Sequence, residues 1–232
     1  MSHPPDVVLQ RAVDSALDEL GDPAVWATPT GYPSSIVLCA IDAIWSIGIS
    51  YKIVTAVVHR YLQGRGFDGI SDAQRCSDTP VEFLDWLDGL GGGRVEALTE
   101  AVNNRNRTSS RNGVLKAAVM VEGCELFKSL GINSSRELFA RVEEVEPMWR
   151  QLQGQKSGIS WRYFLMLAGS DGIKPDRMIH RFLSRHQFPN SLSADEAVSM
   201  LSEGLKNRFV DSGPQVTLRM LDHRIWLTER SH

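Results

Sequence analysis

Apolar residues recur along most of this chain at intervals of three and four, which is the spacing of an amphipathic helix. Val8, Ala12, Ala16 and Leu20 form one such stripe, and further stripes follow almost to the last residue. Helices are predicted over residues 7–20, 34–45, 51–62, 79–90, 94–102, 114–130, 134–145, 161–168, 176–183, 193–208 and 217–228. Because no run alternates as a half-buried strand does, the pattern predicts an all-α fold.

Several of these helices begin at a recognisable N-terminal signal. Thr79 and Glu82 form a capping box with Pro80 at the first helical position, and Ser134 with Glu137 forms another. The apolar stretch over 36–58 carries Asp42 and Lys52, which favours buried core helices over a membrane span. The chain is therefore expected to fold around its own core, with no membrane partner.

A turn in the second half of the chain is the strongest candidate for a binding site. Gly158-Ile159-Ser160 separates two apolar helical runs and predicts a three-residue hairpin, with Ser160 capping the second helix. The first amides of that helix, with the helix dipole behind them, would form an anion site. Lys156 and Arg162 flank the turn, and no acidic residue lies between Glu146 and Asp171.

Asp176 follows this turn and opens the next helix after Pro175. One interpretation is an ordinary N-cap, a frequent role for Asp. The other is a functional carboxylate held at a helix start. The two roles are compatible.

The hairpin, a helix, a loop and then an Asp at a helix start together resemble the helix-hairpin-helix DNA glycosylase superfamily (HhH-GPD, endonuclease III-like). The specific match covers roughly thirty residues, and a weaker one covers residues 33–61. Asp176, in IKPDRMIHRF, matches the catalytic Asp of the family's Val-Asp-Thr-His segment. The resemblance implies excision of a damaged or modified base from duplex DNA, in base excision repair, with Asp176 as the catalytic residue.

The resemblance also implies an architecture of two lobes with a cleft between them. Residues 34–169 would form a helical barrel that ends in the hairpin, and residues 1–33 with 170–232 would form the second lobe. The residues expected to contact DNA are Lys156, Ser157, Gly158, Ile159, Ser160 and Arg162. Those expected to line the base pocket or to wedge into the duplex are Trp45, Ser46, Tyr51 and Lys52, although an ordinary interhelical turn is the alternative there.

Several positions depart from the family's pattern. Ser160 replaces the second hairpin Gly, and Lys156-Ser157 replaces the usual Leu-Pro. Arg162 stands where bifunctional relatives carry a lyase-active lysine, and guanidinium cannot act as that amine. Lys156 is the only amine expected nearby, on the other side of the hairpin. We therefore expect a monofunctional glycosylase without lyase activity.

No cofactor is expected. The family's four-cysteine iron–sulfur cluster lies near the C-terminus, whereas this chain has three cysteines and none after Cys124. Neither the cysteines nor the scattered histidines have the spacing of a zinc site.

Charge favours DNA locally but not globally. The net charge is −3, yet two stretches are basic, one with Arg105, Arg107, Arg111 and Lys116 and one with Lys174, Arg177, Arg181 and Arg185. Basic islands on an acidic chain suit a protein that binds double-stranded DNA by one face, while scattered solvated charges are the alternative. We expect a monomer in the cytoplasm, associated with the nucleoid if bacterial. The competing functions are a non-catalytic helix-hairpin-helix DNA-binding protein and a helical protein-interaction protein.

Overall fold

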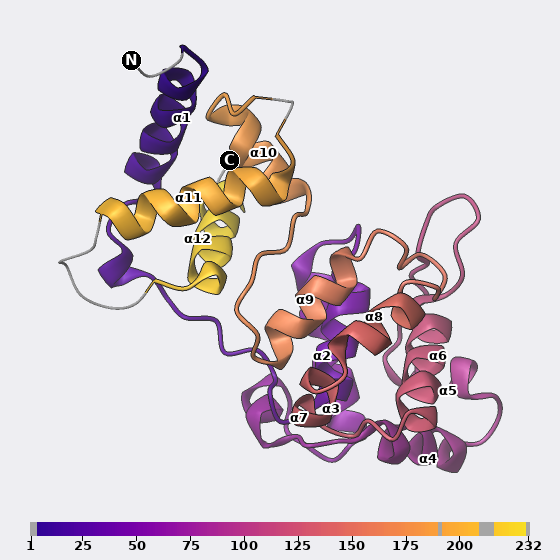
Figure 1. Cartoon of the computed structure of the whole chain (residues 1–232). Helices are drawn as coiled ribbons and strands as arrows, with labels where there is room; N and C mark the ends of the chain where they lie inside the picture. The colour runs from indigo at the N-terminus through magenta and orange to yellow at the C-terminus, as the bar shows by residue number, and fades with distance from the viewer. Residues whose placement is uncertain (1–3, 190–191, 209–215, 231–232) are drawn as a thin grey trace. The chain divides into compact units, whose positions relative to one another are not determined.

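The computed structural model describes residues 4–189, 192–208 and 216–230, in which helices are joined by turns and loops and no strand forms (Figure 1). The predicted all-α fold is confirmed. The elements are α1 (Pro4–Leu20), η1 (Pro23–Val25), α2 (Ile36–Trp45), α3 (Tyr51–Gly64), η2 (Ile70–Arg75), α4 (Pro80–Leu90), α5 (Arg94–Ala101), α6 (Lys116–Ser129), α7 (Ser135–Phe139), α8 (Val142–Trp149), α9 (Ile159–Ala168), α10 (Arg177–Arg185), α11 (Ala194–Arg208) and α12 (Leu218–Arg230).

The chain divides into two compact units, each with its own hydrophobic core. The unit Thr30–Ser170 is called the barrel unit here, after the lobe expected from the sequence, and the terminal unit combines Met1–Pro29 with Asp171–His232. The expected lobes were 34–169, and 1–33 with 170–232. No helix among the described residues has both the length and the apolar character needed to cross a membrane.

Helix α2 forms the centre of the barrel unit. All ten of its residues are buried, and it packs against α3, α6 and α9. Its start is fixed by the Ser35 hydroxyl, which accepts the amide of Leu38 at 3.3 Å. Aromatic rings of Phe127, Trp149 and Phe164 stack beside it with centroids 5.3–5.6 Å apart, which gives α9 a large apolar contact.

A buried lysine closes the other end of α2. The Lys116 ammonium, on α6, donates to the carbonyl oxygens of Ile44, Trp45 and Ile47 at 3.0, 3.0 and 2.6 Å. A helix C-terminus leaves carbonyls without partners and carries negative partial charge, so a cation there satisfies both. The expectation that Lys116 belongs to a basic surface is therefore wrong, because its side chain is 1% exposed.

The predicted helix over 134–145 is in fact two pieces. Ser134 caps α7 through the amide of Glu137, as the capping box predicts, but α7 ends at Phe139 and α8 starts at Val142. Leu138 and Val145, on either side of the break, are both fully buried. The apolar spacing is thus preserved across the interruption, which explains why the pattern suggests one helix.

The terminal unit packs α1, α10, α11 and α12 around a second core. Helices α1 and α11 cross closely at Gly204, where an added Cβ would lie 2.7 Å from the Val13 Cγ1 atom. The start of α12 is held by Asp171, whose carboxylate accepts the amides of Leu218 and Arg219 at 3.1 and 2.9 Å. The segment that leads into α10 is thereby tied to α12.

Candidate functional site

The hairpin is longer than the sequence predicts. Helix α8 ends at Trp149, and α9 begins only after Gly158, whose φ of 77° is left-handed and suits glycine. The prediction that Ser160 caps α9 is wrong, because Gly158 holds that position. The Ser160 side chain is buried inside the unit and its hydroxyl accepts the Trp149 indole N–H at 3.0 Å.

The predicted DNA-contacting residues divide into exposed and buried ones. Lys156, Ser157 and Arg162 are exposed, Ile159 is half-buried, and Gly158 and Ser160 are buried. The first amides of α9 have no acceptors inside the helix and lie at the positive end of its dipole. Arg150 adds a cation, which is paired with Glu146 at 3.4 Å and whose Nε donates to the Lys156 carbonyl at 3.1 Å. The hairpin surface, as we call residues 150–162, therefore combines helix amides with basic side chains.

A basic loop packs against this hairpin surface, a contact that the sequence alone does not predict. The Gln153 amide donates to the Asn112 carbonyl at 3.2 Å, and an added Cβ on Gly154 would lie 2.6 Å from the Thr108 Cβ atom. The loop over 103–113 is thus a direct neighbour of the hairpin surface.

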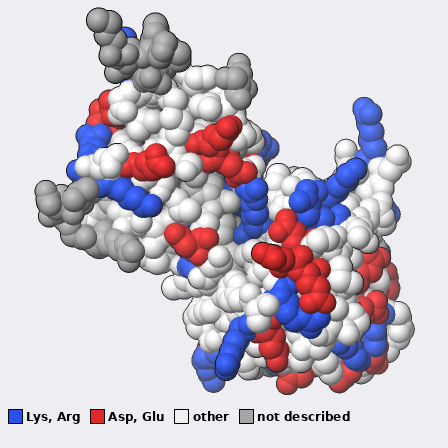
Figure 2. All heavy atoms as spheres, in the orientation of Figure 1, with Lys and Arg blue, Asp and Glu red and all other residues white. Residues whose placement is uncertain are grey.

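The charges of that loop are partly engaged within the barrel unit. Arg105 pairs with Glu96, Arg107 donates to the Gly113 carbonyl, and Arg111 is exposed. Blue and red side chains are interspersed over the face drawn in Figure 2. A DNA contact here would therefore use a few cations rather than a continuous basic field.

Two of the predicted pocket residues, Ser46 and Tyr51, contact a carboxylate that the sequence analysis did not assign to the site. Asp42 is 1% exposed, and its oxygens accept the hydroxyls of Tyr32, Ser46 and Tyr51 at 3.2, 2.9 and 3.4 Å. Burial, reinforced by Asp42, raises the pKa of both tyrosines above the usual range. The signal in the sequence was an Asp inside an otherwise apolar helix.

Trp45 and Lys52 lie apart from this carboxylate group. Trp45 is fully buried and its indole N–H donates to Asn104 at 2.8 Å, so none of its surface reaches solvent. Lys52 is exposed in the first turn of α3. The structure therefore brings together Ser46 and Tyr51, through Asp42, but not all four predicted residues.

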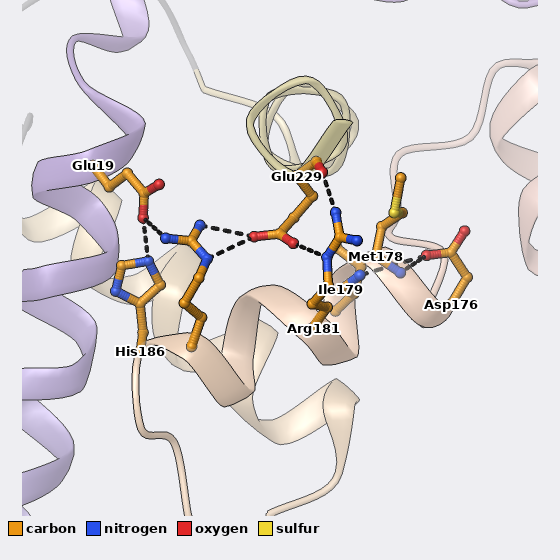
Figure 3. Close-up of polar contacts among 8 residues, drawn as sticks. Glu19, Asp176, Met178, Ile179, Arg181, His186 and Glu229 are labelled. Atoms are coloured by element: carbon orange, nitrogen blue, oxygen red, sulfur yellow. Dashed lines mark hydrogen bonds and ion pairs between the residues drawn. The ribbon is translucent and has the colours of Figure 1, made fainter. Parts of the chain in front are cut away.

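Asp176 is the N-cap of α10 in the terminal unit (Figure 3). Its Oδ1 atom accepts the amides of Met178 and Ile179 at 2.8 and 3.5 Å, which leaves Oδ2 facing the Lys174 ammonium at 3.3 Å. The Asp176 side chain is 25% exposed. The expectation that Lys156 is the only amine near the site is wrong, because Lys174 contacts the candidate catalytic carboxylate.

A charged network holds α10, which carries Asp176, against its neighbours (Figure 3). Glu229 of α12 is 1% exposed and pairs with Arg181 and Arg185. Arg185 and His186 also contact Glu19 of α1, at 2.7 and 2.6 Å. Burial alone would raise the pKa of Glu229, but the guanidinium groups of Arg181 and Arg185 outweigh this effect and lower it.

The second basic stretch of the sequence is therefore largely structural. Lys174, Arg181 and Arg185 are ion-paired within the terminal unit, although the two arginines are also exposed to solvent. Arg177 and His180 are exposed on α10 as well. The sequence suggests that these cations form one surface, because their contacts with Glu19 and Glu229 join residues far apart along the chain and leave no local pattern.

No metal centre is evident among the described residues, where no three His, Cys, Asp or Glu side chains are grouped to hold an ion. Cys39, Cys76 and Cys124 are buried free thiols, and burial raises the pKa of each. A raised pKa keeps a thiol protonated and poorly reactive. These cysteines therefore serve as core residues.

Comparison with known proteins places the chain in a family but gives it no function. Neither a curated protein nor a solved structure matches it. A family model matches residues 10–230, which takes in every helix described above except the start of α1. The chain therefore belongs to DUF8548, a domain of unknown function.

Proposed function

We propose that the protein is a monofunctional DNA glycosylase, which hydrolyses the N-glycosidic bond of a damaged or modified base flipped from double-stranded DNA. The observation that carries the proposal is Asp176. It combines the position implied by the sequence resemblance with a fixed carboxylate at a helix N-terminus. In this account the protein acts as a monomer without a cofactor, in the cytoplasm or on the nucleoid.

The chemistry needs a carboxylate that is ionised and held in place. Loss of a base builds positive charge on the sugar, which a fixed carboxylate stabilises while it orients or deprotonates a water. One oxygen of Asp176 is held in place by two backbone amides at the N-terminus of α10. The other oxygen is available to the reaction, with Lys174 beside it.

DNA binding would use the hairpin surface. The α9 N-terminus supplies amides for a phosphate, and Lys156, Arg162 and Arg150 supply charge. Arg111 on the adjacent loop could contact a neighbouring phosphate. A flipped base would then need a pocket of polar and aromatic groups, for which Ser46 and Tyr51 remain candidates.

The alternative is a DNA-binding protein that keeps the fold without the chemistry. The observation in its favour is Ser160, which stands where the family has glycine and whose side chain is buried against Trp149. Asp176 would then be a cap alone. A helical protein-interaction role is the third candidate, and a gel-shift with duplex DNA separates it from the other two.

We expect Gly158→Val to weaken duplex binding across all sequences. A valine at φ 77° is strained by about 1–3 kcal/mol and would distort the start of α9, where the amides face the phosphate. The measurement is gel-shift affinity as a function of salt, because phosphate contacts weaken as salt rises.

Gly91→Val is the matched control for this variant. Gly91 has φ 79°, ends α4 in the same unit, and has no atom within 4 Å of an added Cβ. Both variants should lose similar stability, and only Gly158→Val should lose affinity. Equal affinities for the two folded variants would remove the hairpin from the interface.

We expect the purified protein to be colourless and to form no borohydride-trapped adduct with DNA. The cluster ligands are missing, and Arg162 occupies the position of the lyase-active lysine. The measurements are an absorption spectrum and a denaturing gel after reduction. A covalent adduct would contradict the monofunctional assignment and would point first to Lys174, the amine in contact with Asp176.

A further inference from the structure

Helix α12 reaches the segment before Asp176 through one carboxylate. The Asp222 Oδ1 atom accepts the backbone N–H of Lys174 at 2.9 Å. The Lys174 carbonyl in turn accepts the N–H of Asp176 at 2.7 Å, and its ammonium lies 3.3 Å from Asp176 Oδ2. Lys174 is thus held by Asp222 through its main chain and contacts Asp176 through both main chain and side chain.

We propose that Asp222 is a positioning residue for Asp176, which acts through Lys174 and whose charge determines how fully the lysine neutralises the catalytic carboxylate. This inference rests on the proposed glycosylase function. It assigns to that site a second carboxylate that comes from the far end of the chain.

The pKa of Asp222 lies near neutral pH. Burial raises the pKa of Asp222 to about 7; the amide and ammonium of Lys174 oppose this rise, and the negative charge of Asp176 adds to it. Asp222 therefore carries a proton below about pH 7, while the neighbouring Asp176 accepts two backbone amides.

Other charged groups around Asp222 are engaged elsewhere or neutral. On α12, the Arg219 guanidinium donates to the Pro29 carbonyl, and burial lowers the pKa of His223. From α10, Arg181 binds Glu229, and from α1, Glu19 binds Arg185. Lys174 and Asp176 are therefore the charges through which Asp222 would act.

Ionisation of Asp222 should accelerate base release. When Asp222 is neutral, the Lys174 ammonium pairs with Asp176 without competition from the Asp222 carboxyl. When Asp222 is charged, it attracts the Lys174 ammonium in competition with Asp176, and it adds a second negative charge in the neighbourhood of Asp176. Both effects favour the transition state, and we expect the rate to rise about tenfold through pH 7.

The test is single-turnover base release from pH 5.5 to 8.5 by the full chain. Asp222→Asn keeps an acceptor for the Lys174 amide but cannot ionise, so its profile should lose the rise. Asp171→Asn is the matched control, because the Asp171 carboxylate also accepts backbone amides in the terminal unit, those of Leu218 and Arg219 at the start of α12. A rise retained in Asp222→Asn would overturn the proposal.

A second measurement keeps this inference separate from the proposed function. NMR titration of the Asp222 carboxyl needs no activity, and Asp176→Asn should lower its pKa by removing a like charge. An unchanged pKa would overturn the coupling even in an active enzyme. Absence of base release with the coupling present would instead overturn the glycosylase function.

Stability gives a third readout with a defined sign. The pKa of an Asp in the unfolded chain is about 4, and folding raises that of Asp222 to about 7. The protonated carboxyl therefore contributes its full stability below about pH 4, and this contribution is lost as the pH rises through about 7. Wild type should therefore lose melting temperature relative to Asp222→Asn between pH 5 and pH 8. A difference that stays constant over this range would contradict the assignment.

Discussion

Asp176→Asn is expected to slow base release at least about a hundredfold, which corresponds to about 3 kcal/mol of lost transition-state stabilisation. The amide oxygen of Asn can still accept the N–H groups of Met178 and Ile179, so the cap is largely kept. Loss of stability should not exceed about 1 kcal/mol. Duplex binding should persist or tighten, because a negative charge close to phosphate is removed. Single-turnover rates, melting curves and gel-shift affinities measure the three effects.

Asp22→Asn supplies the matched control for this substitution. Asp22 also caps a helix in the terminal unit, where it accepts the amide of Ala24 at 2.9 Å. Asp22→Asn is therefore expected to leave the rate of base release unchanged. Base release at the wild-type rate in Asp176→Asn would refute the active-site assignment. A large fall in melting temperature would instead show that Asp176 is chiefly an N-cap.

Lys116→Met is expected to destabilise the barrel unit by about 3–5 kcal/mol, because three carbonyls at and just after the end of α2, two of them buried, lose the Lys116 donor. For a chain of this size the melting temperature should fall by on the order of 10 °C. The effect should reach the loop between α2 and α3, where Ser46 and Tyr51 lie. Thermal unfolding followed by circular dichroism measures it.

Lys128→Met provides the comparison on the same helix. Lys128 is exposed on α6, so its replacement should change stability by less than about 0.5 kcal/mol. A similar melting temperature for the two variants would show that the buried ammonium contributes little to the barrel unit.

Periodicity predicted the helices well because each one buries a continuous apolar stripe. Helix α2 illustrates this, since its uniformly apolar sequence predicts complete burial and all its residues are buried. The break between α7 and α8 was missed because Leu138 and Val145 keep helical spacing across it. The hydrophobic pattern predicts which side chains face the core, but it does not predict where a helix is interrupted.

The candidate site could be predicted only where its signal is local. Asp176 at a helix start follows from Pro175 and the next apolar run, and the structure has it as a cap. The sequence did not predict the contacts of three buried or partly buried charges. The partners of Lys116 lie 69–72 residues away along the chain, and that of Asp222 lies 48 residues away. Those of Asp42 lie 4–10 residues away, beyond the end or before the start of its helix. Buried charges are defined by tertiary partners, so a charged residue within an apolar helix is the one sequence signal that could reveal them.

The most direct test of the glycosylase account is base excision by the wild-type chain from a panel of duplexes, each with one damaged or modified base. Treatment with hot alkali afterwards converts every abasic site into a strand break. The account predicts breaks at the modified base in at least one duplex, dependent on alkali and lost in Asp176→Asn. Duplexes that are bound in a gel-shift yet remain intact across the whole panel would contradict it, and would favour a non-catalytic DNA-binding protein.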